Sequence, residues 1–336
     1  MILVLILCAA LWAVASVLQA PKWQRWLAMG VVWTGAFVWF RVPLDMGSDN
    51  ARVWVLVTAA AVLVFGYSSL LRRLKRRAQP VVPAGAKPLF QLEELDRYAR
   101  HILLREIGGP GQKAMKQARV LVIGAGGLGS PALLYLAASG VGLIAVMDDD
   151  VVEGSNLQRQ IIHQTGNIGR DKVASAKAAM LALNPYIEVR AIKARFGADT
   201  DLMDYDLILD GSDNFDTRYL ANRLAARAGK SLISAAITQW EGQISLYDPA
   251  HGTPCYECIF PNRPAPGMVP TCAEAGVAAP LPGVIGAMMA MEAVKHLTGA
   301  GEGLKGRLMI YDALYAEVRV IGIKPRPDCA VCGADH

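Results

Sequence analysis

Charged side chains are absent from the first twenty residues of this chain of 336, and that stretch is almost entirely apolar. A cleaved secretory signal carries a basic residue ahead of its apolar core, and none precedes this one, which argues against a signal peptide. Internal repeats and low-complexity tracts are also missing from the sequence. Their absence argues against a repeat architecture.

Apolar runs dominate the N-terminal region instead. They cover residues 2–20, 26–40 and 53–71. A bilayer core of about 30 Å needs about 20 helical residues, so the first and third runs are long enough to cross it and the second is short. The sequence therefore predicts a membrane anchor over residues 1–77 with about three transmembrane helices.

The distribution of charge predicts the orientation of this anchor. Lys22 and Arg25 follow the first run and a basic cluster, residues 72–77, follows the third, so both should face the cytoplasm. We therefore expect a multi-pass protein of the inner membrane with its large domain in the cytoplasm. Residues 1–90 carry ten Lys and Arg against two Asp and Glu, a net charge of +8, whereas the remainder carries 24 against 27, or −3. An acidic large domain argues against nucleic acid as a partner.

A linker rich in Pro, Ala and Gly is expected at residues 78–90, followed by one compact domain over residues 91–336. The remaining motifs lie in this domain, which is long enough to bury a core.

A glycine motif organises the domain. An apolar run at Val120 ends at a GAGGLG motif, a helical pattern follows to about Ser139, and a second apolar run ends in Asp148. This order of strand, turn, helix and strand is typical of a nucleotide-binding α/β fold, in which the carboxylate binds a ribose hydroxyl. The glycines let the backbone and the helix N-terminus approach phosphate. The nucleotide site would then contain Gly124, Gly126, Gly127, Gly129 and Asp148.

Polar residues that follow Asp148 indicate which class of reaction the site supports. Asp150, Asn156, Arg159 and Gln160 lie just past the strand end. An enzyme that cleaves a triphosphate needs fixed cations such as Arg159 to stabilise charge on the phosphate oxygens, whereas hydride transfer has no general need for one. The pattern favours triphosphate chemistry and leaves an NAD-dependent oxidoreductase as a distant alternative.

A further strand is expected to end at Asp210, followed by Gly-Ser-Asp-Asn, and parallel sheets bind ligands at such strand ends. Carboxylates beside a triphosphate require a cation between them, and magnesium is the natural one. Asp210 is expected to cap or support the strand end.

Two C-x-x-C pairs provide four thiols, at Cys255, Cys258, Cys329 and Cys332. Four thiolates are the ligand set of a closed structural zinc site, and disulfides are disfavoured in the cytoplasm. The zinc would fasten the C-terminal tail to the sheet. His163 and His296 lack metal-ligand spacing and receive no role, and the apolar segment 284–297 is expected to be a core or dimer helix.

The order of these motifs resembles a known family. The matching blocks are RYARHILL, GAGGLG, DDDVVEGSNLQRQ, Lys172, GSDN, CYEC, TCAEAG and CAVC, from about Leu92 to Gly333. Together they resemble the ubiquitin-activating superfamily in its bacterial MoeB/ThiF form. The resemblance implies a Rossmann-like mixed sheet flanked by helices. It also implies ATP-dependent adenylation of the C-terminal Gly-Gly carboxylate of a ubiquitin-like sulfur carrier, as in molybdopterin or thiamine sulfur transfer.

The same resemblance implies residue roles. Asp148 holds the ribose, Asp213 holds magnesium, and the phosphates are bound by Asn156, Arg159, Lys172 and, from the partner subunit of a homodimer, Arg100. Asp150, Gln160 and Asn214 complete the expected nucleotide site. Cys272, in a loop near the carrier's C-terminus, is either a nucleophile or a small buried apolar residue. Sulfur would come from another protein, because no sulfurtransferase domain follows.

Alternatives to a sulfur carrier remain open at this point. Another carboxylate, on a peptide or a tRNA, or a membrane-localised ubiquitin-like conjugation system would use the same nucleotide motifs. A non-catalytic membrane scaffold would require a key residue to be missing, and none is.

Overall fold

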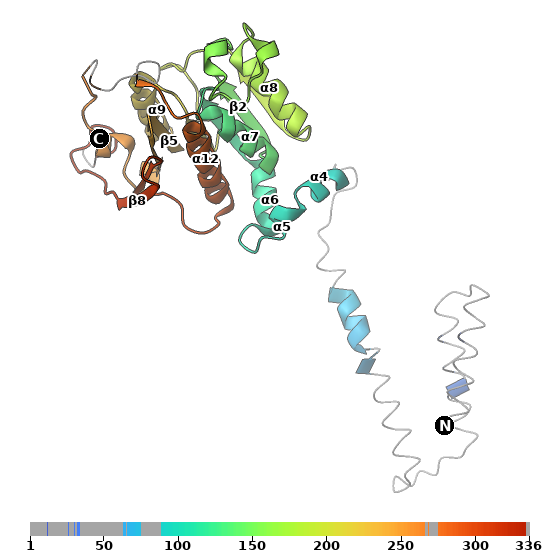
Figure 1. The fold of residues 1–336 in the computed structure, drawn as a ribbon. Coiled ribbons are helices and arrows are strands. Elements are labelled where there is room, and N and C mark those ends of the chain that lie inside the picture. The colour runs from blue at the N-terminus through green and yellow to red at the C-terminus, as the bar shows by residue number, and fades with distance from the viewer. Residues whose placement is uncertain are drawn as a thin grey trace. The chain divides into compact units, whose positions relative to one another are not determined.

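The computed structural model describes residues 12, 26, 30, 32–33, 63–64, 66–74, 89–265, 268 and 275–333. The chain divides into two units, Met1–Lys87 and Pro88–His336 (Figure 1).

The membrane prediction for the first unit is contradicted. Among the described residues, no helix has both the length and the apolar character needed to cross a bilayer. The predicted location in the inner membrane is therefore wrong. Most of the predicted spans 2–20, 26–40 and 53–71 lie outside the described residues.

The second unit is built on an eight-stranded mixed sheet with the order β3-β2-β1-β4-β5-β6-β7-β8. Strands β1 to β5 run parallel, and β6, β7 and β8 continue the sheet in antiparallel pairs. The strands are β1 (Arg119–Ile123), β2 (Leu143–Met147), β3 (Glu188–Ile192), β4 (Leu207–Asp210), β5 (Ser231–Thr238), β6 (Glu241–Tyr247), β7 (Arg307–Asp312) and β8 (Glu317–Gly322). The predicted mixed α/β fold is confirmed.

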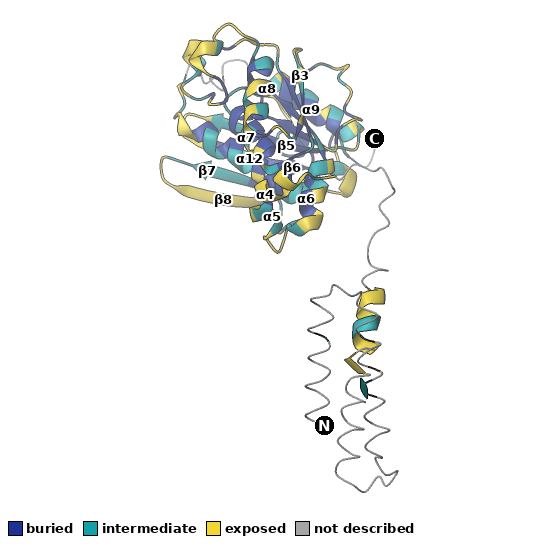
Figure 2. Cartoon of the chain, turned by 90° about the vertical axis from the view of Figure 1, so that its right-hand side faces the viewer, coloured by how far each residue is buried: buried dark blue, intermediate teal, exposed yellow. Residues whose placement is uncertain are grey.

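The burial of each strand agrees with its position in the sheet. Every residue of β2 and β4 is buried, as expected for central parallel strands covered by helices on both faces. Every residue of β8 is exposed (Figure 2). Along this strand, charged Glu317 and Arg319 alternate with apolar Val318 and Val320. This charged, exposed strand forms one edge of the sheet.

Helices cover both faces of the sheet (Figure 1). Successive strand residues point to opposite faces, and on β5 Ile233 packs in one apolar cluster with α7, α8 and α12 while Leu232 packs in another with α9 and α10. The helices are α4 (Leu92–Arg97), α5 (Ala99–Ile102), α6 (Gly108–Gln117), α7 (Gly129–Ser139), α8 (Lys172–Leu183), α9 (Phe215–Arg227), α10 (Tyr256–Ile259) and α12 (Pro280–Thr298). The apolar segment 284–297 lies within α12, which contributes Ile285 and Met289 to the core.

Helix α12 approaches the start of α7 at a glycine. A Cβ atom at Gly286 would lie 2.3 Å from the carbonyl oxygen of Leu128 and 2.4 Å from Cγ of Pro131. At Gly283, one turn earlier on the same helix, a Cβ would meet nothing within 4 Å. The close packing of these helices therefore depends on the missing side chain at Gly286.

Gly286→Ala is expected to lower the free energy of unfolding by about 2 kcal/mol or more, because the added methyl group clashes with backbone that cannot move freely. Gly283→Ala is the matched control and should raise stability by up to about 1 kcal/mol through helix propensity. Urea unfolding of both variants measures the difference. Equal stabilities would contradict the close contact.

Candidate functional site

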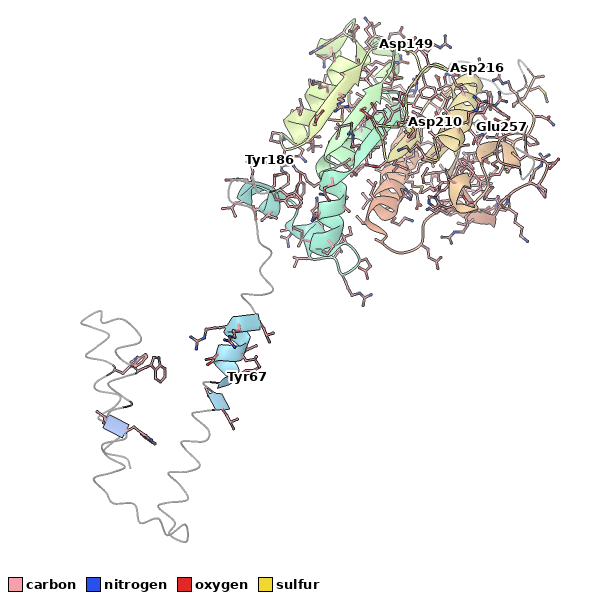
Figure 3. All side chains as sticks on the ribbon, turned by 180° about the vertical axis from the view of Figure 1, so that it is seen from behind. Tyr67, Asp149, Tyr186, Asp210, Asp216 and Glu257 are labelled. Atoms are coloured by element: carbon pink, nitrogen blue, oxygen red, sulfur yellow. The ribbon has the colours of Figure 1, made fainter. Side chains whose placement is uncertain are left out.

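A pocket of about 880 Å³ lies at the carboxyl ends of the parallel strands. Its volume is within the range of small-molecule sites, about 300 to 1,000 Å³. Its walls include the glycine turn after β1, the acidic segment after β2 and the loop after β4. Figure 3 labels Asp149, which lines the pocket from the acidic segment, and Asp216, which lines it from the first turn of α9 after the loop that follows β4. The sheet order places these segments together because β1 lies between β2 and β4.

The glycine turn requires its glycines for different reasons. Gly124 has φ +92°, which side chains rarely adopt, and a Cβ at Gly129 would lie 2.0 Å from the carbonyl oxygen of Gly124. A Cβ at Gly127 would lie 3.1 Å from Cβ of Pro282. A Cβ at Gly126 would be in ordinary contact with Nε2 of Gln160, at 3.7 Å, and with no other atom of the described residues within 4 Å beyond its chain neighbours. Gly126 and Gly127 line the pocket, so the backbone itself forms part of its wall.

Asp148 joins the end of β2 to this turn. Its Oδ2 accepts the N–H of Ala125 at 2.8 Å, and its Oδ1 accepts the N–H of Asp150 at 2.9 Å. A carboxylate has about four acceptor positions, so both oxygens keep capacity for a ligand hydroxyl. The carboxylate is held in a defined orientation at the pocket wall.

Lys172 is nearly buried at the first position of α8, with its side chain 6 % exposed. Its Nζ forms an ion pair of 2.7 Å with Oδ2 of Asp150, whose side chain is 65 % exposed. Both residues line the pocket. A buried ammonium group needs a counter-charge, and Asp150 supplies it.

Arg159 lines the pocket after the short 3₁₀ helix η1 (Gly154–Asn156). Its Nη2 donates to Oδ1 of Asn156 at 2.9 Å, and Nδ2 of Asn156 donates to Glu153 at 3.2 Å. Asn156 is not among the residues that line the described pocket, so its amide orients Arg159. The neighbouring Gln160 is buried, lines the pocket, and has an Oε1 without a partner in the described part of the chain. That oxygen is a free acceptor for a ligand.

The loop after β4 rests on a buried ion pair that the sequence analysis missed. Asp210 is fully buried and accepts Nε of Arg218 at 3.3 Å and Oγ of Ser234 at 2.8 Å. Nη2 of Arg218 donates to the carbonyl oxygens of Ser212 and Ala235, each at 2.9 Å. The expected support of the strand end by Asp210 is thus present. The only sequence signal for Arg218 is its position one helical turn after Asn214, which an exposed arginine would share.

Asp213 is exposed on this loop and lines the pocket. Asn214 follows it and caps α9, accepting the N–H of Thr217 at 2.8 Å. The cap fixes the point at which the loop ends and the helix begins. The Asp213 carboxylate therefore projects from a well-defined loop, within reach of the same ligand as Lys172 and Arg159.

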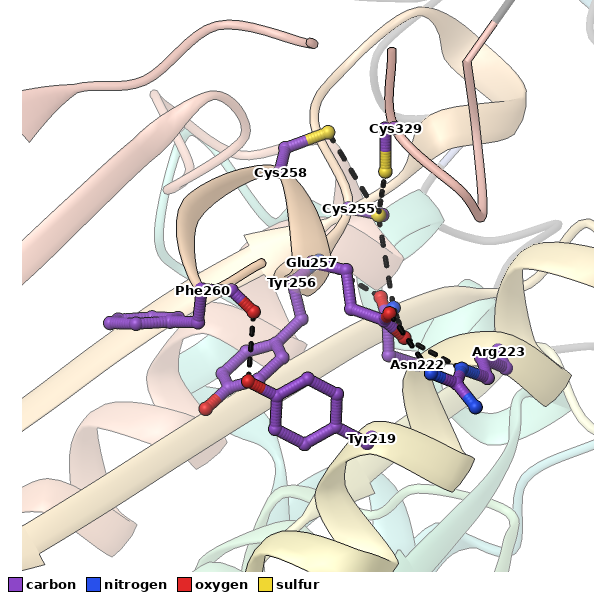
Figure 4. Close-up of polar contacts among 9 residues, drawn as sticks. All are labelled: Tyr219, Asn222, Arg223, Cys255, Tyr256, Glu257, Cys258, Phe260 and Cys329. Carbon is purple, nitrogen blue, oxygen red and sulfur yellow. Dashed lines mark hydrogen bonds and ion pairs between the residues drawn. The ribbon is translucent and has the colours of Figure 1, made fainter. Parts of the chain in front are cut away.

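The four predicted cysteines form one cluster. Figure 4 shows three of them, Cys255, Cys258 and Cys329. The Sγ atoms of Cys255 and Cys258 lie 3.9 Å apart, those of Cys255 and Cys329 3.6 Å, and those of Cys258 and Cys332 3.4 Å. Four sulfur atoms placed tetrahedrally at about 2.3 Å from a zinc ion would be about 3.8 Å apart. The cluster can therefore hold a metal ion, and none of these four cysteines forms a disulfide.

The cysteine cluster is connected to α9 and the pocket. Asn222 on α9 donates to Sγ of Cys255 at 3.7 Å and accepts the N–H of Tyr256 at 2.8 Å. Arg223 on the same helix pairs with Glu257 at 2.9 Å (Figure 4). Tyr256 lines the pocket, and burial raises the pKa of its phenol to about 12, so it stays neutral. The cluster thus supports one wall of the pocket.

Among the predicted nucleotide-site residues that the structure describes, Gly129, Asn156 and Arg100 do not line the pocket. Arg100 is exposed on α5 and is not among the residues that line the described pocket. Cys272 lies outside the described residues.

Comparisons with known proteins agree with this geometry. The ThiF family profile matches residues 98–331. The chain is 47 % identical over 248 residues to the sulfur carrier protein adenylyltransferase of Thermus thermophilus, covering 72 % of this chain and 92 % of that protein. It is 46 % identical over 243 residues to the SAMP-activating enzyme E1 of Haloferax volcanii, covering 71 % and 89 %.

A further relative is longer. The chain is 48 % identical over 254 residues to the probable adenylyltransferase/sulfurtransferase MoeZ of Mycobacterium tuberculosis, covering 74 % of this chain but only 64 % of that protein. Among solved structures, E. coli MccB with ATP superposes with a TM-score of 0.58 at 25 % identity, covering 66 % of this chain and 69 % of that one.

Proposed function

The chain belongs to the ThiF family and is an adenylyltransferase, and from this premise we propose that its pocket activates the C-terminal Gly-Gly carboxylate of a ubiquitin-like sulfur-carrier protein. A carboxylate oxygen of the carrier attacks the α-phosphorus of ATP. The bond from that phosphorus to the oxygen bridging the β-phosphate breaks, and the products are the carrier acyl-adenylate and pyrophosphate. The observation that carries the proposal is the similarity to a sulfur carrier adenylyltransferase along 92 % of that protein's length.

The nucleoside part of ATP is assigned to the turn and the acidic segment. Asp148 accepts a ribose hydroxyl through the acceptor positions that its two backbone contacts leave open. Gln160, whose Nε2 lies near Gly126, offers a second acceptor through its Oε1, which has no partner among the described residues. The glycine turn allows the backbone to approach the phosphates closely.

The phosphates are assigned to Arg159 and Lys172. Asn156 holds the Arg159 guanidinium, so little reorganisation is needed when negative charge grows during the reaction. Without nucleotide, the Lys172 ammonium group pairs with Asp150. When ATP binds, a phosphate oxygen either takes the place of the Asp150 carboxylate or binds the ammonium group beside it. Because the attacking carboxylate is already ionised, catalysis consists mainly of positioning and charge stabilisation.

Magnesium is assigned to Asp213. The exposed carboxylate is a hard oxygen donor at the pocket, of the kind that magnesium binds while keeping several waters. A magnesium ion bound there would neutralise charge between this carboxylate and the triphosphate.

Zinc is assigned to Cys255, Cys258, Cys329 and Cys332, whose sulfur spacing fits four-coordinate binding. The zinc is structural, because four protein ligands leave no open position. By joining residues more than seventy positions apart, it holds the C-terminal segment against the wall that contains Tyr256.

A homodimer completes the site in this proposal. Arg100 does not line the described pocket of its own chain and is exposed on α5, so its guanidinium is available to the phosphates of a partner subunit. Three exposed apolar side chains, Leu92, Leu103 and Leu104, flank it on the same N-terminal segment of the domain.

Carrier-dependent exchange of pyrophosphate into ATP is expected for the purified protein. Asp213→Ala should lower the exchange rate by about 100-fold or more, because the metal loses its protein ligand. Asp216→Ala is the matched control: Asp216 lies on the same rim and pairs with Arg263, and its loss should leave the magnesium dependence unchanged. Exchange with a peptide but with no Gly-Gly carrier would refute the sulfur-carrier proposal.

Metal analysis tests the zinc proposal. The purified protein should contain about one zinc per chain, and Cys332→Ser should reduce that content and lower the melting temperature. Cys272 is not one of the four proposed ligands, so Cys272→Ser is the control and should leave the zinc content unchanged. Retention of full zinc content by Cys332→Ser would show that the metal is held elsewhere.

Mixing two inactive variants tests the shared site. Arg100→Ala and Asp213→Ala homodimers should each be inactive, but subunit exchange between them restores one complete site per mixed dimer, for about a quarter of wild-type activity. If activity does not recover after verified subunit exchange, Arg100 acts in the site of its own chain or in neither site.

A further inference from the structure

His163 contacts the glycine turn, and the proposed function assigns it no role. It is 6 % exposed, and both of its ring nitrogens have partners. Nε2 lies 2.9 Å from the carbonyl oxygen of Ala125, and Nδ1 lies 2.9 Å from Oγ of Ser175. A buried histidine thus connects the glycine turn to helix α8.

The partners determine which nitrogen carries the proton. A carbonyl oxygen can only accept a hydrogen bond, so Nε2 must be protonated and donate to Ala125. The neutral ring then uses Nδ1 as an acceptor for the hydroxyl of Ser175, whose oxygen in turn accepts Nδ2 of Asn167 at 3.1 Å. Burial lowers the pKa of His163, which agrees with a neutral ring.

The contact with Ala125 fixes a peptide group of the turn. The described peptide bonds are all trans, and in a trans peptide the N–H points opposite to the C=O. By holding the carbonyl of Ala125, His163 determines the direction of the N–H of Gly126, which lines the pocket. Ala125 is held at its other end as well, because its own N–H donates to Asp148.

The other side of the imidazole reaches the helix that carries Lys172. Ser175 lies on α8 one turn after Lys172. The ring therefore spans two elements that both contribute to the phosphate end of the pocket, the glycine turn and the start of α8. The ring can therefore keep the Gly126 N–H and the Lys172 ammonium group at a constant distance from each other.

We propose that His163 is a positioning residue for the nucleotide: its Nε2–H orients the Ala125–Gly126 peptide, and its Nδ1 ties that peptide to α8, so that the Gly126 N–H and Lys172 bind the phosphates of one ATP. This inference rests on the proposed function for the identity of the nucleotide. His163 itself touches neither the nucleotide nor the carrier, and it acts through the turn.

Two substitutions separate the contacts of the ring. The amide nitrogen of Gln occupies roughly the position of Nε2, and that of Asn the position of Nδ1. His163→Gln keeps a donor for Ala125 and should retain most of the ATP affinity. His163→Asn keeps only the link to Ser175 and should raise the dissociation constant for Mg·ATP by about 3- to 10-fold, the loss expected for one neutral hydrogen bond. Calorimetric titration with Mg·ATP measures both.

A third substitution, at Ser175, covers the possibility that His163→Asn does not fold. Ser175→Ala removes the hydroxyl that donates to Nδ1, so the ring loses its link to α8 while its Nε2–H can still donate to Ala125. It should weaken Mg·ATP binding in the same direction but by less than His163→Asn, with a melting temperature near that of the wild type. His296→Asn, a partly buried histidine on α12 away from the turn, is the matched control and should leave ATP affinity unchanged.

Equal ATP affinity of His163→Asn, His163→Gln and the wild type, or equal loss in both variants, would overturn the assignment. So would a loss of melting temperature without any change in affinity. Failure of the wild type to catalyse carrier-dependent exchange while it still binds Mg·ATP would refute the proposed carrier instead, and the affinity pattern would still decide the role of His163.

Discussion

The hydrogen bond from the Ala125 N–H to Asp148 joins the two strand ends on which the pocket is built. It forms because β1 and β2 are adjacent and parallel, in register from Arg119 opposite Leu143 to Ile123 opposite Met147. The turn after one strand therefore meets the carboxylate after the other. Asp150 and, through it, Lys172 are positioned from the same carboxylate, so the nucleotide wall depends on this one contact.

Two ion pairs at the strand ends differ in burial, and the difference matches their roles. Asp210 and Arg218 are both buried and share further hydrogen bonds, so they form a permanent support for the loop that carries Asp213. Lys172 is buried, but its partner Asp150 is largely exposed to the pocket. A phosphate can therefore compete for Lys172 without exposing a second buried charge. The structure separates a fixed support from an exchangeable contact.

The cysteine cluster extends this support to the opposite side of the pocket. Asn222 and Arg223 on α9 contact residues of the first C-x-x-C pair, and α9 starts at the loop that carries Asp213. One helix therefore connects the proposed magnesium residue at its N-terminal end with the proposed zinc ligands further along. Loss of the metal would loosen the far wall and the helix together.

The sequence by itself determined the order of strands and turns, the glycine motif and the paired cysteines, because these are local patterns of spacing and apolar periodicity. The same reasoning was wrong for the membrane location, since no helix among the described residues is long and apolar enough to cross a bilayer. Only the tertiary structure decided which side chains meet: Lys172 with Asp150, Arg218 with Asp210, and His163 with Ala125. These pairs depend on strand order and helix packing, which bring together residues that no sequence spacing relates.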